Sequence, residues 1–395
     1  MSDRTTIETV DAADLDSAAR ADWRAFRDAR PELASPYFDL RYILAASQVA
    51  PGAAVAVIRQ AGQIAGFFPF QRRGGLIQPL AAPLTDYHGL ISRPGAEIDL
   101  AEVVAALGAR RFRYSSLVES GVARAEGEGR SAMVADLSGG YEGWLTLRRA
   151  AGHGDFLRDK RRRLRQLEAQ HGKVTFALES RAADVLELVL ALKSEQMQRT
   201  GQHDVFSAGW TQGLLRRLTA SAEPDFGLRF AVLRAGEQIV AAELGLLSGR
   251  SYHLWFPIYD PEYAKFSPGA LMTLASLEAL AAHGVTSVDF GPEGEDYKKF
   301  FADRAGQVLE GDVRAGHRPL DALTDVALGA APSTLRRAAR RLDRRLDRIT
   351  ACEPQMGPRV GAALRTVALM GRRHRKFTVG AGQGLAALGA ALTAK

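Results

Sequence analysis

The chain has 395 residues, of which 46% are hydrophobic and 25% are charged, and its formal net charge is +7. This composition is typical of a globular protein and excludes a disordered or fibrous chain, while the length exceeds what one hydrophobic core organises. The single cysteine, Cys352, excludes an internal disulfide and fits a reducing compartment, and the N-terminus lacks the apolar core of a signal peptide. We therefore expect a cytoplasmic protein of two domains with an appendage.

The first part of the chain alternates helical and strand patterns. The expected helices cover residues 13–29, 101–110 and a stretch that begins near Tyr141. The expected strands cover residues 53–60, 63–72, 111–117 and 131–137, and the first two of them are joined by a turn at Ala61-Gly62. These elements predict a mixed α/β unit over residues 1–150.

The second part repeats this plan more clearly. The expected helices cover residues 155–170, 181–199, 207–220 and 270–284. The expected strands are residues 173–180, a hairpin over 229–249 that turns at Ala235-Gly236, and residues 251–260, 286–291 and 307–313. The last strand closes the unit, so a second α/β unit is predicted over residues 151–318.

The tail, residues 319–395, differs in charge. From Pro332 onward the chain has 14 Lys or Arg and three Asp or Glu, a net charge of +11, which leaves about −4 for the remaining residues. Leu335, Ala338, Leu342, Leu346 and Ile349 recur at helical spacing with arginines on the opposite face. The C-terminal stretch is too short and too poor in large apolar side chains for a membrane span. The tail predicts basic amphipathic helices that lie on an anionic membrane surface.

Two sequence segments suggest a family. DPEYAKFSPG, residues 260–269, links a strand to a helix, and VDFGPEGEDYKKFF, residues 288–301, contains the next strand and a polar turn. The order of the predicted elements resembles the acyl-CoA site of the GNAT acyltransferase superfamily. The amino-acid sequence of the two segments resembles that of its CelD-like group, to which bacterial ceramide synthases belong. The two similar units also resemble the tandem GNAT arrangement of FemAB-like proteins. The resemblance implies a tandem GNAT-like α/β fold with acyl-CoA as co-substrate and no metal.

The loop before residue 270 is the expected site for the coenzyme phosphates. Ser267 is placed to cap the helix and Pro268 to begin it, so the amides of Gly269, Ala270 and Leu271 would face an anion. An ordinary capped helix is the alternative. Lys298 is expected to contact a phosphate or an acidic group of the substrate.

Three residues are predicted to do the chemistry. Glu243 has apolar or glycine neighbours, and desolvation would raise its pKa into the range of a general base, although a carboxylate at a strand edge is equally compatible. His253 can shuttle protons near neutral pH, but a single strand histidine is more often structural. The resemblance implies Tyr297 as the acid for the departing thiolate, against a plain packing role.

The expected acceptor site combines both units. Asp86, Tyr87 and His88 stand in a polar loop of the first unit, and Asp289 ends a strand of the second, where it either orients the site or caps a turn. Between Lys160 and Arg165 five basic side chains share one helix, a pattern that fits coenzyme phosphates, a lipid surface or a solvated helix face.

We therefore predict an acyl-CoA-dependent N-acyltransferase that acts on a lipidic amine at the cytoplasmic face of the inner membrane, with a sphingoid base as the sharpest choice. Acylation of a polysaccharide or its precursor and FemAB-like aminoacyl transfer are alternatives. A non-catalytic membrane or nucleic-acid adaptor is a third. No nucleic acid is expected as partner, because aromatic side chains are not interleaved with the arginines of the tail.

Overall fold

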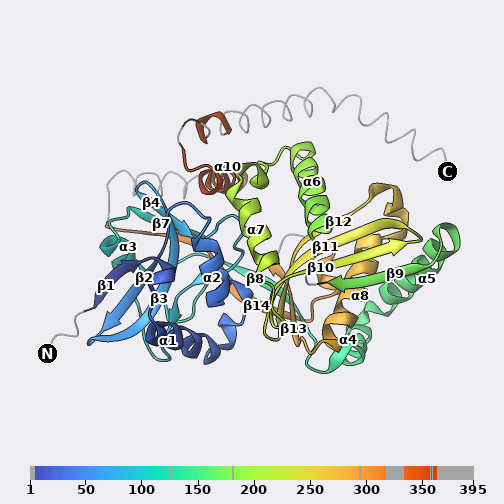
Figure 1. The fold of residues 1–395 in the computed structure, drawn as a ribbon, viewed down its shortest axis with the longest axis horizontal. Helices are drawn as coiled ribbons and strands as arrows, with labels where there is room; N and C mark the ends of the chain where they lie inside the picture. The colour runs from blue at the N-terminus through green and yellow to red at the C-terminus, as the bar shows by residue number, and fades with distance from the viewer. Residues whose placement is uncertain are drawn as a thin grey trace.

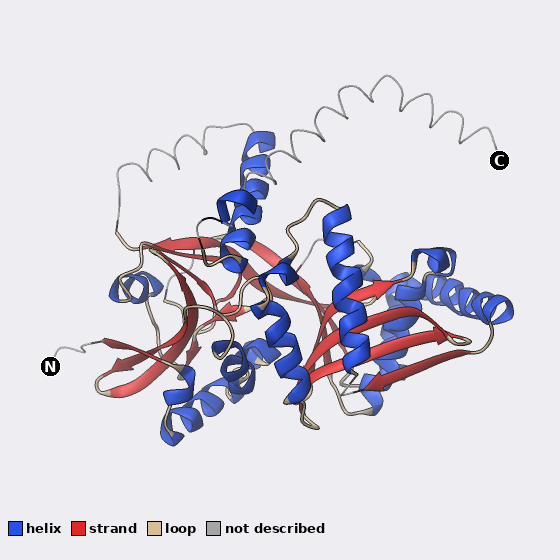
Figure 2. Ribbon diagram, turned by 45° about the horizontal axis from the view of Figure 1, so that its top comes forward, coloured by secondary structure: helices blue, strands red, loops and turns tan. Residues whose placement is uncertain are grey.

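The computed structural model describes residues 5–123, 126–179, 182–292, 296–316, 333–355, 357 and 359–362. Within these residues 14 strands form one mixed sheet that runs through the whole molecule, with helices on both faces (Figures 1 and 2). The strand order is β1-β2-β3-β4-β7-β14-β8-β13-β12-β11-β10-β9, with β5 and β6 paired to β7 and β3. The first and second parts of the chain therefore share a sheet.

The first part supplies eight of the described strands and four of the described helices. The strands are β1 (Thr6–Val10), β2 (Ala53–Gln60), β3 (Gln63–Arg73), β4 (Leu76–Pro79), β5 (His88–Gly89), β6 (Ile91–Ser92), β7 (Arg111–Val118) and β8 (Glu128–Asp136). The helices are α1 (Ser17–Asp28), α2 (Leu40–Ser47), α3 (Leu100–Ala106) and α4 (Gly140–Arg148), with short 3₁₀ turns at Ala12–Asp14, Pro31–Leu33 and Pro36–Phe38.

The second part and the tail supply the other strands and helices that the structure describes. The strands are β9 (Val174–Glu179), β10 (Phe226–Ala235), β11 (Gln238–Ser248), β12 (Ser251–Tyr259), β13 (Ser287–Pro292) and β14 (Arg304–Arg314). The helices are α5 (Gly154–His171), α6 (Ala183–Arg199), α7 (Trp210–Ala220), α8 (Pro268–Ala282) and α10 (Ser333–Cys352), with a π-turn at Arg149–His153 and 3₁₀ turns at η5 (Val205–Ala208), η6 (Pro261–Phe266) and η7 (Lys298–Phe300).

Local sequence explains several element boundaries. The turn at Ala61-Gly62 is confirmed, because both residues have positive φ, as a two-residue hairpin loop requires. The second hairpin turns one residue later than predicted, since Ala235 still pairs with Gln238. Helix α7 begins three residues later than predicted, because Gly209 has φ 68° and separates it from the 3₁₀ turn before it.

The position of β14 differs from the prediction. We expected residues 307–313 to close the second unit, but β14 lies between β7 and β8, both from the first 150 residues, and is antiparallel to each. Strand β13 in turn pairs with β8. Strands are thus exchanged across the boundary near residue 150, so neither part has a sheet of its own.

The two faces of the sheet carry different helices in the second part. Helices α6 and α7 pack on one face of β10, β11 and β12, and α5 and α8 pack on the other. The core on the α6 and α7 side continues into the first part, because Trp23 and Phe67 belong to the same buried cluster as Leu214 and Leu244. A common core of this kind fixes the two parts relative to each other.

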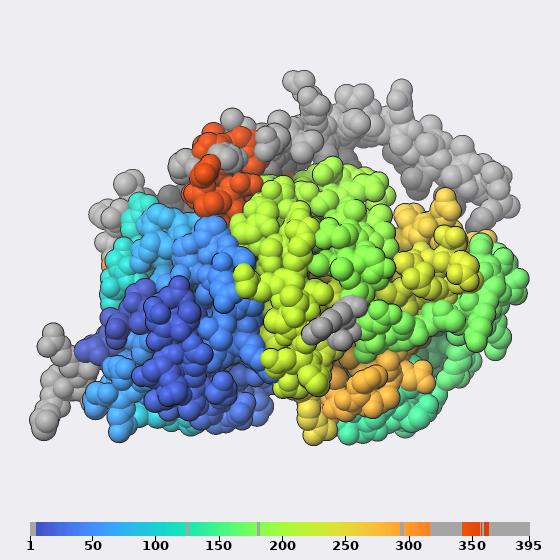
Figure 3. All heavy atoms as spheres, viewed as in Figure 1, coloured from blue at the N-terminus to red at the C-terminus, as the bar shows by residue number. Residues whose placement is uncertain are grey.

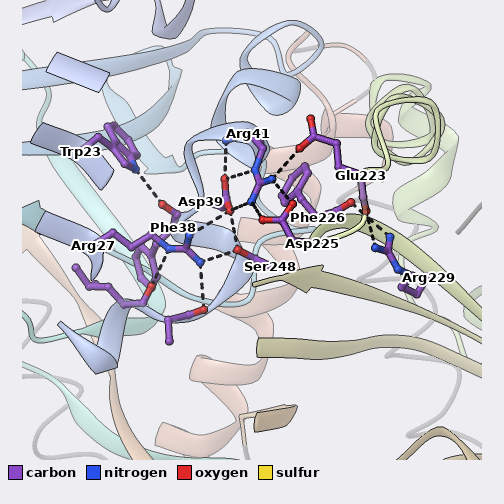
Figure 4. A network of polar contacts seen from close by, with 12 residues as sticks. Trp23, Arg27, Phe38, Asp39, Arg41, Glu223, Asp225, Phe226, Arg229 and Ser248 are labelled. Atoms are coloured by element: carbon purple, nitrogen blue, oxygen red, sulfur yellow. Dashed lines mark hydrogen bonds and ion pairs between the residues drawn. The ribbon is translucent and has the colours of Figure 1, made fainter. Parts of the chain in front are cut away.

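A buried carboxylate also links the two parts (Figure 4). Asp39 is 4% exposed and forms ion pairs with Arg27 at 3.1 Å and with Arg41 at 2.9 Å. It also accepts a hydrogen bond of 2.6 Å from Ser248 at the end of β11, and Arg41 reaches Asp225 at 2.9 Å. Charge and hydrogen bonds from both parts of the chain therefore converge on one side chain.

Part of the predicted tail packs on the body. Ile349 and Cys352 on α10 are buried, so the predicted apolar stripe meets protein at this end of the helix. The side chains of Leu335 and Ala338, and residues 319–332 and 363–395, lie outside the described residues. None of the helices in the described ranges is both long enough and apolar enough to cross a bilayer.

Candidate active site

The candidate active site lies where β12 and β13 separate. The two strands are parallel partners only from Ser251 and Ser287 to His253 and Asp289. Beyond that point β12 remains paired with β11, and a β-bulge at Trp255 shifts the register of this pair. Strand β13 continues beside β8. The strands separate at His253, so beyond this residue the backbone groups of β12 and β13 no longer pair with each other.

His253, in the second part of the chain, contacts Asp86 in the first part. Its imidazole is fully buried, with Nε2 2.9 Å from Oδ2 of Asp86 and Nδ1 3.8 Å from Oδ1 of Asp289. A proton lies between Nε2 and Oδ2, because two lone pairs do not approach so closely without one. The side chain of Asp86 is 38% exposed, so this pair faces solvent on the side of the carboxylate.

Asp289 is held in place by two donors. Its Oδ1 accepts hydrogen bonds from the Tyr87 hydroxyl at 2.9 Å and from the Gly291 amide at 2.6 Å. Burial raises the pKa of Asp289 above its usual value, although the charge of His253 and these two donors oppose the shift. Burial also raises the pKa of Tyr87 well above its usual value, so its hydroxyl keeps the proton that it donates.

Two further residues complete the cluster. Tyr37 packs its ring edge-on to His253 with centroids 5.0 Å apart, and its buried hydroxyl has no hydrogen-bond partner among the described residues. Gly291 has φ 81°, and a side chain there would lie 3.7 Å from both Asp86 and His253 and 3.8 Å from Nζ of Lys298. The Lys298 ammonium therefore lies near Asp86 and His253. Sequence reasoning missed Tyr37, because an aromatic residue in a helical turn carries no catalytic signal.

Glu243 is not part of this cluster. It is fully buried, accepts a hydrogen bond of 3.2 Å from Tyr252, and burial raises its pKa to about 8. Its side chain lies on the opposite face of the sheet from His253, because His253 pairs with Leu246 and residues 243 and 246 of one strand point to opposite sides. Glu243 is desolvated as predicted, but it lies on the face of the sheet that α5 and α8 cover.

The start of α8 differs from the prediction at two residues. Ser267 adopts a left-handed conformation, with φ 58°, and its side chain does not cap the helix. The Leu271 amide donates to the Ser267 carbonyl at 3.1 Å, so it is not free for an anion. Pro268 has no N–H, and the amides of Gly269 and Ala270 are the two that the first turn of the helix leaves unused.

The basic residues of α5 lie beside this helix start. Lys160 is 8% exposed, and its ammonium contacts Asp159 at 2.9 Å and the Ser267 hydroxyl at 3.2 Å. Arg163 binds Asp159 at 2.8 Å and donates a hydrogen bond to the Lys265 carbonyl. Lys160 and Arg163 thus lie beside the turn that begins α8, with Asp159 as their common partner, and cations next to unused helix amides can bind phosphates.

His88 and Tyr297 have different surroundings. His88 is buried, and its Nε2 accepts hydrogen bonds from the Ser115 and Ser116 amides at 3.2 and 3.3 Å. Burial lowers its pKa to about 3, so it stays neutral and fixes the backbone, which corrects its expected role in holding the acceptor. Tyr297 directly precedes the short helix η7, is 37% exposed and packs on Phe301 with ring centroids 6.3 Å apart.

The second part of the chain matches a known domain. Residues 154–299 match the family model described as the acetyltransferase (GNAT) domain. The chain carries a GNAT acyltransferase domain. The predicted fold class, an α/β chain of GNAT-like units, is confirmed by this match together with the mixed sheet. No curated protein matches the chain.

Several solved structures align with about four fifths of this chain. A tandem GNAT protein from the clavulanic acid biosynthesis pathway shares 12% identity, covers 80% of this chain and 100% of its own, and has a TM-score of 0.46. FemX shares 10% identity, covers 80% of this chain and 99% of its own, and has a TM-score of 0.47. A conserved protein from Bacteroides thetaiotaomicron shares 12% identity, with coverage of 77% and 100% and a TM-score of 0.44.

The arrangement provides what acyl transfer from coenzyme A needs. The GNAT acyltransferase domain takes acyl-CoA as co-substrate, and the start of α8 offers a phosphate site. The Asp86–His253 pair can accept a proton, and Asp289, which accepts a hydrogen bond from Tyr87, lies 3.8 Å from the other imidazole nitrogen. Among the described residues, no group of three or more His, Cys, Asp and Glu side chains has the geometry to hold a metal ion.

Proposed function

We propose that this protein transfers a fatty acyl group from acyl-CoA to the nitrogen of a lipidic amine, with a sphingoid base as the best candidate. The observation that supports this most is the position of buried His253 and its partner Asp86 at the point where β12 and β13 separate. The amino-acid sequence of residues 260–269 and 288–301, which resembles that of the CelD-like group, supports the choice of acceptor.

The proposed binding mode follows the polar groups from α8 to His253. The diphosphate of the coenzyme lies at the amides of Gly269 and Ala270 and is bound by Lys160 and Arg163. The pantetheine arm runs between β12 and β13, whose backbone groups are not paired with each other there. The thioester then reaches His253 and Gly291, which has no side chain.

The chemistry divides among few groups. The acceptor arrives as an ammonium ion and gives one proton to the Asp86–His253 pair. The nitrogen lone pair then forms a bond to the thioester carbonyl carbon, and the carbon–sulfur bond breaks. The departing thiolate takes a proton from Tyr297, which we assign because this residue directly precedes Lys298, whose ammonium lies near Gly291. The nitrogen gives up its second proton as the amide forms, and this proton restores the tyrosine through solvent. The products are an amide, free coenzyme A and one proton, which leaves the Asp86–His253 pair to solvent.

The test is a direct measurement of products. Purified protein is incubated with acyl-CoAs from acetyl to long-chain, together with amines that have or lack a sphingoid chain, and product masses are read. We expect an amide only with a long-chain acyl-CoA and a lipidic amine. An acylated sugar would favour the polysaccharide alternative, and the absence of any product would remove the proposal.

Lys160 is expected to bind the coenzyme. A charge-assisted hydrogen bond contributes about 1.5–3 kcal/mol, so Lys160→Ala should raise the Kd for acyl-CoA about 10- to 100-fold. The matched control is Arg158→Ala, because Arg158 stands on the same helix with a side chain that is 75% exposed and pairs only locally with Asp155. Isothermal titration calorimetry measures both. Equal losses in the two variants would place the coenzyme away from Ser267.

Each chain should bind one acyl-CoA. In the first part, β4 and β7 are also parallel, at Leu76 with Arg111 and Ile77 with Phe112, and α3 lies between them in sequence. Further along β7, however, β5 pairs with Leu117 and Val118. Strand β5 thus occupies the position beside β7 that corresponds, in the second part, to the gap between β13 and β12. We expect a calorimetric stoichiometry of one, and two equivalents per chain would contradict this view.

Membrane contact is assigned to residues beyond α10. Residues 363–395 have six Lys or Arg and no Asp or Glu, and each basic residue near an anionic surface contributes about 1 kcal/mol. Deletion of residues 363–395 should therefore reduce sedimentation with anionic vesicles at least about tenfold. Neutral vesicles are the control. Unchanged sedimentation would remove the inner membrane as the proposed location.

A further inference from the structure

The 3₁₀ turn η3 (Pro36–Phe38) brings a side chain of the first part to the candidate active site. Tyr37, in the middle of this turn, packs its ring edge-on to His253 with centroids 5.0 Å apart. It also packs edge-on to Trp255, with centroids 5.8 Å apart. Both partners belong to β12, at and just beyond the point where β13 leaves this strand. The Tyr37 ring is therefore in direct contact with the imidazole of the site.

The turn that carries Tyr37 is held on both sides. The indole nitrogen of Trp23 donates a hydrogen bond of 2.9 Å to the Phe38 carbonyl (Figure 4). The residue after the turn, Asp39, accepts a hydrogen bond of 2.6 Å from Ser248 of β11. Helices α2 and α7 pack against each other at this junction, where the blue and yellow-green atoms meet in Figure 3. Tyr37 therefore has a fixed position relative to β11 and β12.

The hydroxyl of Tyr37 is buried without a hydrogen bond. The residue is 1% exposed, and its hydroxyl has no partner among the residues that the structure describes. Proteins seldom leave a buried polar group in this condition, and such a group beside a substrate site is available to bind a ligand. Burial raises the pKa of Tyr37 well above its usual value, so the phenol stays protonated near neutral pH. It can therefore both donate and accept a hydrogen bond.

Two neighbouring tyrosines show the contrast. The ring of Tyr42 is fully buried, with its centroid 5.2 Å from that of Tyr37. The Tyr42 hydroxyl lies 2.7 Å from the hydroxyl of Thr85, which donates in turn to the Leu80 carbonyl at 2.6 Å. The Tyr87 hydroxyl donates to a carboxylate at 2.9 Å. Within the described ranges, the protein thus satisfies the hydroxyls of the two neighbours but not that of Tyr37.

The groups around His253 suit an amine with a neutral polar group beside it. Asp86 contacts the imidazole at 2.9 Å and has a side chain that is 38% exposed, so its charge attracts an ammonium ion from solvent. The Tyr37 hydroxyl is uncharged and pairs best with a hydroxyl, which also donates and accepts. Because Asp86 and Tyr37 contact the same imidazole, a small ligand that reaches both carries its hydroxyl within a few bonds of its nitrogen.

We propose that Tyr37 binds a hydroxyl group of the acceptor, carried on a carbon next to the one that bears the amine, while Asp86 faces the ammonium. The inference rests on the proposed function, because it takes His253 and Asp86 as the acceptor end. Protein covers the Tyr37 hydroxyl in this structure, so the entering acceptor must displace a neighbouring side chain. A sphingoid base meets the requirement, since both carbons beside its amine carbon bear hydroxyls. Tyr37 then distinguishes such bases from simple long-chain amines.

The test compares the binding of four amines of the same chain length. They bear hydroxyls on both carbons next to the amine carbon, on the terminal one only, on the inner one only, or on neither. We expect wild-type protein to bind at least one hydroxylated amine about 5- to 150-fold more tightly than the amine without a hydroxyl, which gives the buried phenol nothing to bind. Calorimetry measures each Kd, and the two amines with one hydroxyl identify the group recognised. Equal affinities would overturn the proposal.

Two variants that each lose a single hydroxyl locate the effect. Tyr37→Phe should abolish the preference and leave the Kd of the amine without a hydroxyl within about twofold of wild type. Tyr42→Phe should keep the preference, because Thr85 retains its hydrogen bond to the Leu80 carbonyl. An unchanged preference in Tyr37→Phe, or an equal weakening of all four amines, would contradict the assignment. These measurements need no acyl-CoA, so they succeed or fail separately from the proposed reaction.

The stability of the same two variants checks the state of the hydroxyl itself. The Tyr37 hydroxyl makes no hydrogen bond in the described part of the chain, so Tyr37→Phe should leave the urea midpoint of unfolding at or above that of wild type. Tyr42→Phe removes a buried hydrogen bond and should lower the midpoint. An equal loss in the two variants would show that the Tyr37 hydroxyl already has a partner inside the protein, and the proposal would then be wrong.

Discussion

Replacing His253 by glutamine should lower kcat for amide formation by about 10²- to 10⁴-fold, the usual contribution of a general base. The imidazole is the buried partner of Asp86 at the strand separation, and glutamine keeps a polar side chain there but cannot accept and return a proton. Steady-state kinetics with the productive acyl-CoA and amine measure the effect. The Kd for acyl-CoA should stay within about twofold, because the proposed phosphate site lies at α8.

Glu243→Gln is the matched control for this experiment. Glu243 is as deeply buried as His253, but burial raises its pKa to about 8, so below that pH its carboxyl is protonated and resembles an amide in shape and charge. We expect kcat to stay within about threefold of wild type at pH 7, since no proton transfer passes through this face. A large loss in Glu243→Gln with a small loss in His253→Gln would reverse the assignment of the base.

Replacing Asp39 by alanine should cost about 3–5 kcal/mol of the free energy of unfolding, the usual effect of removing one partner of a buried ion pair. The change leaves Arg27, whose side chain is 16% exposed, without its carboxylate and removes the acceptor of Ser248. It thereby breaks the polar link between α1, α2 and β11. Urea denaturation monitored by tryptophan fluorescence measures the loss.

Glu223→Ala provides the comparison on the same network. Glu223 also pairs with Arg41, at 2.9 Å, but its side chain is 56% exposed, and such surface pairs contribute about 0–1 kcal/mol. Equal costs in the two variants would show that burial does not matter at this junction.

The same carboxylate predicts a pH dependence of stability. Burial by itself would raise the pKa of Asp39, but the hydrogen bond from Arg41 and the charge of Arg27 outweigh it and hold the pKa below its usual value. A lowered pKa means that the stabilisation is fully present above the ordinary carboxyl value of about 4 and is lost as the pH falls through the folded value. Denaturation midpoints of Asp39→Ala and wild type should therefore converge only in acid.

Sequence patterns predicted most of the elements because those signals are local. The two-residue turn at Ala61-Gly62 needs only residues with left-handed φ between two apolar strands. The segment from β12 through α8 to β13 is contiguous in the chain, so its order was visible in the sequence and agrees with the GNAT match. Asp86 and Tyr87 were visible as polar residues in an apolar setting, and the structure brings them to His253 and Asp289.

The errors concern contacts between distant residues. The pairing of β14 with β7 and β8 depends on register across about 170 to 200 residues, which no local pattern encodes. The left-handed conformation of Ser267 is imposed by the turn before it and removes the expected cap. The capping of α10 by Arg73 joins residues that are 278 positions apart. Such contacts are decided by packing, because each residue type involved is ordinary in isolation.

The strongest single test is a crystal structure of the protein with a non-hydrolysable acyl-CoA analogue. The account predicts the diphosphate within hydrogen-bond distance of the Gly269 and Ala270 amides and of the Lys160 ammonium. It predicts the carbonyl carbon of the analogue between β12 and β13, next to His253 and Gly291. A coenzyme bound with its diphosphate away from α8, or with its acyl end remote from His253, would contradict it.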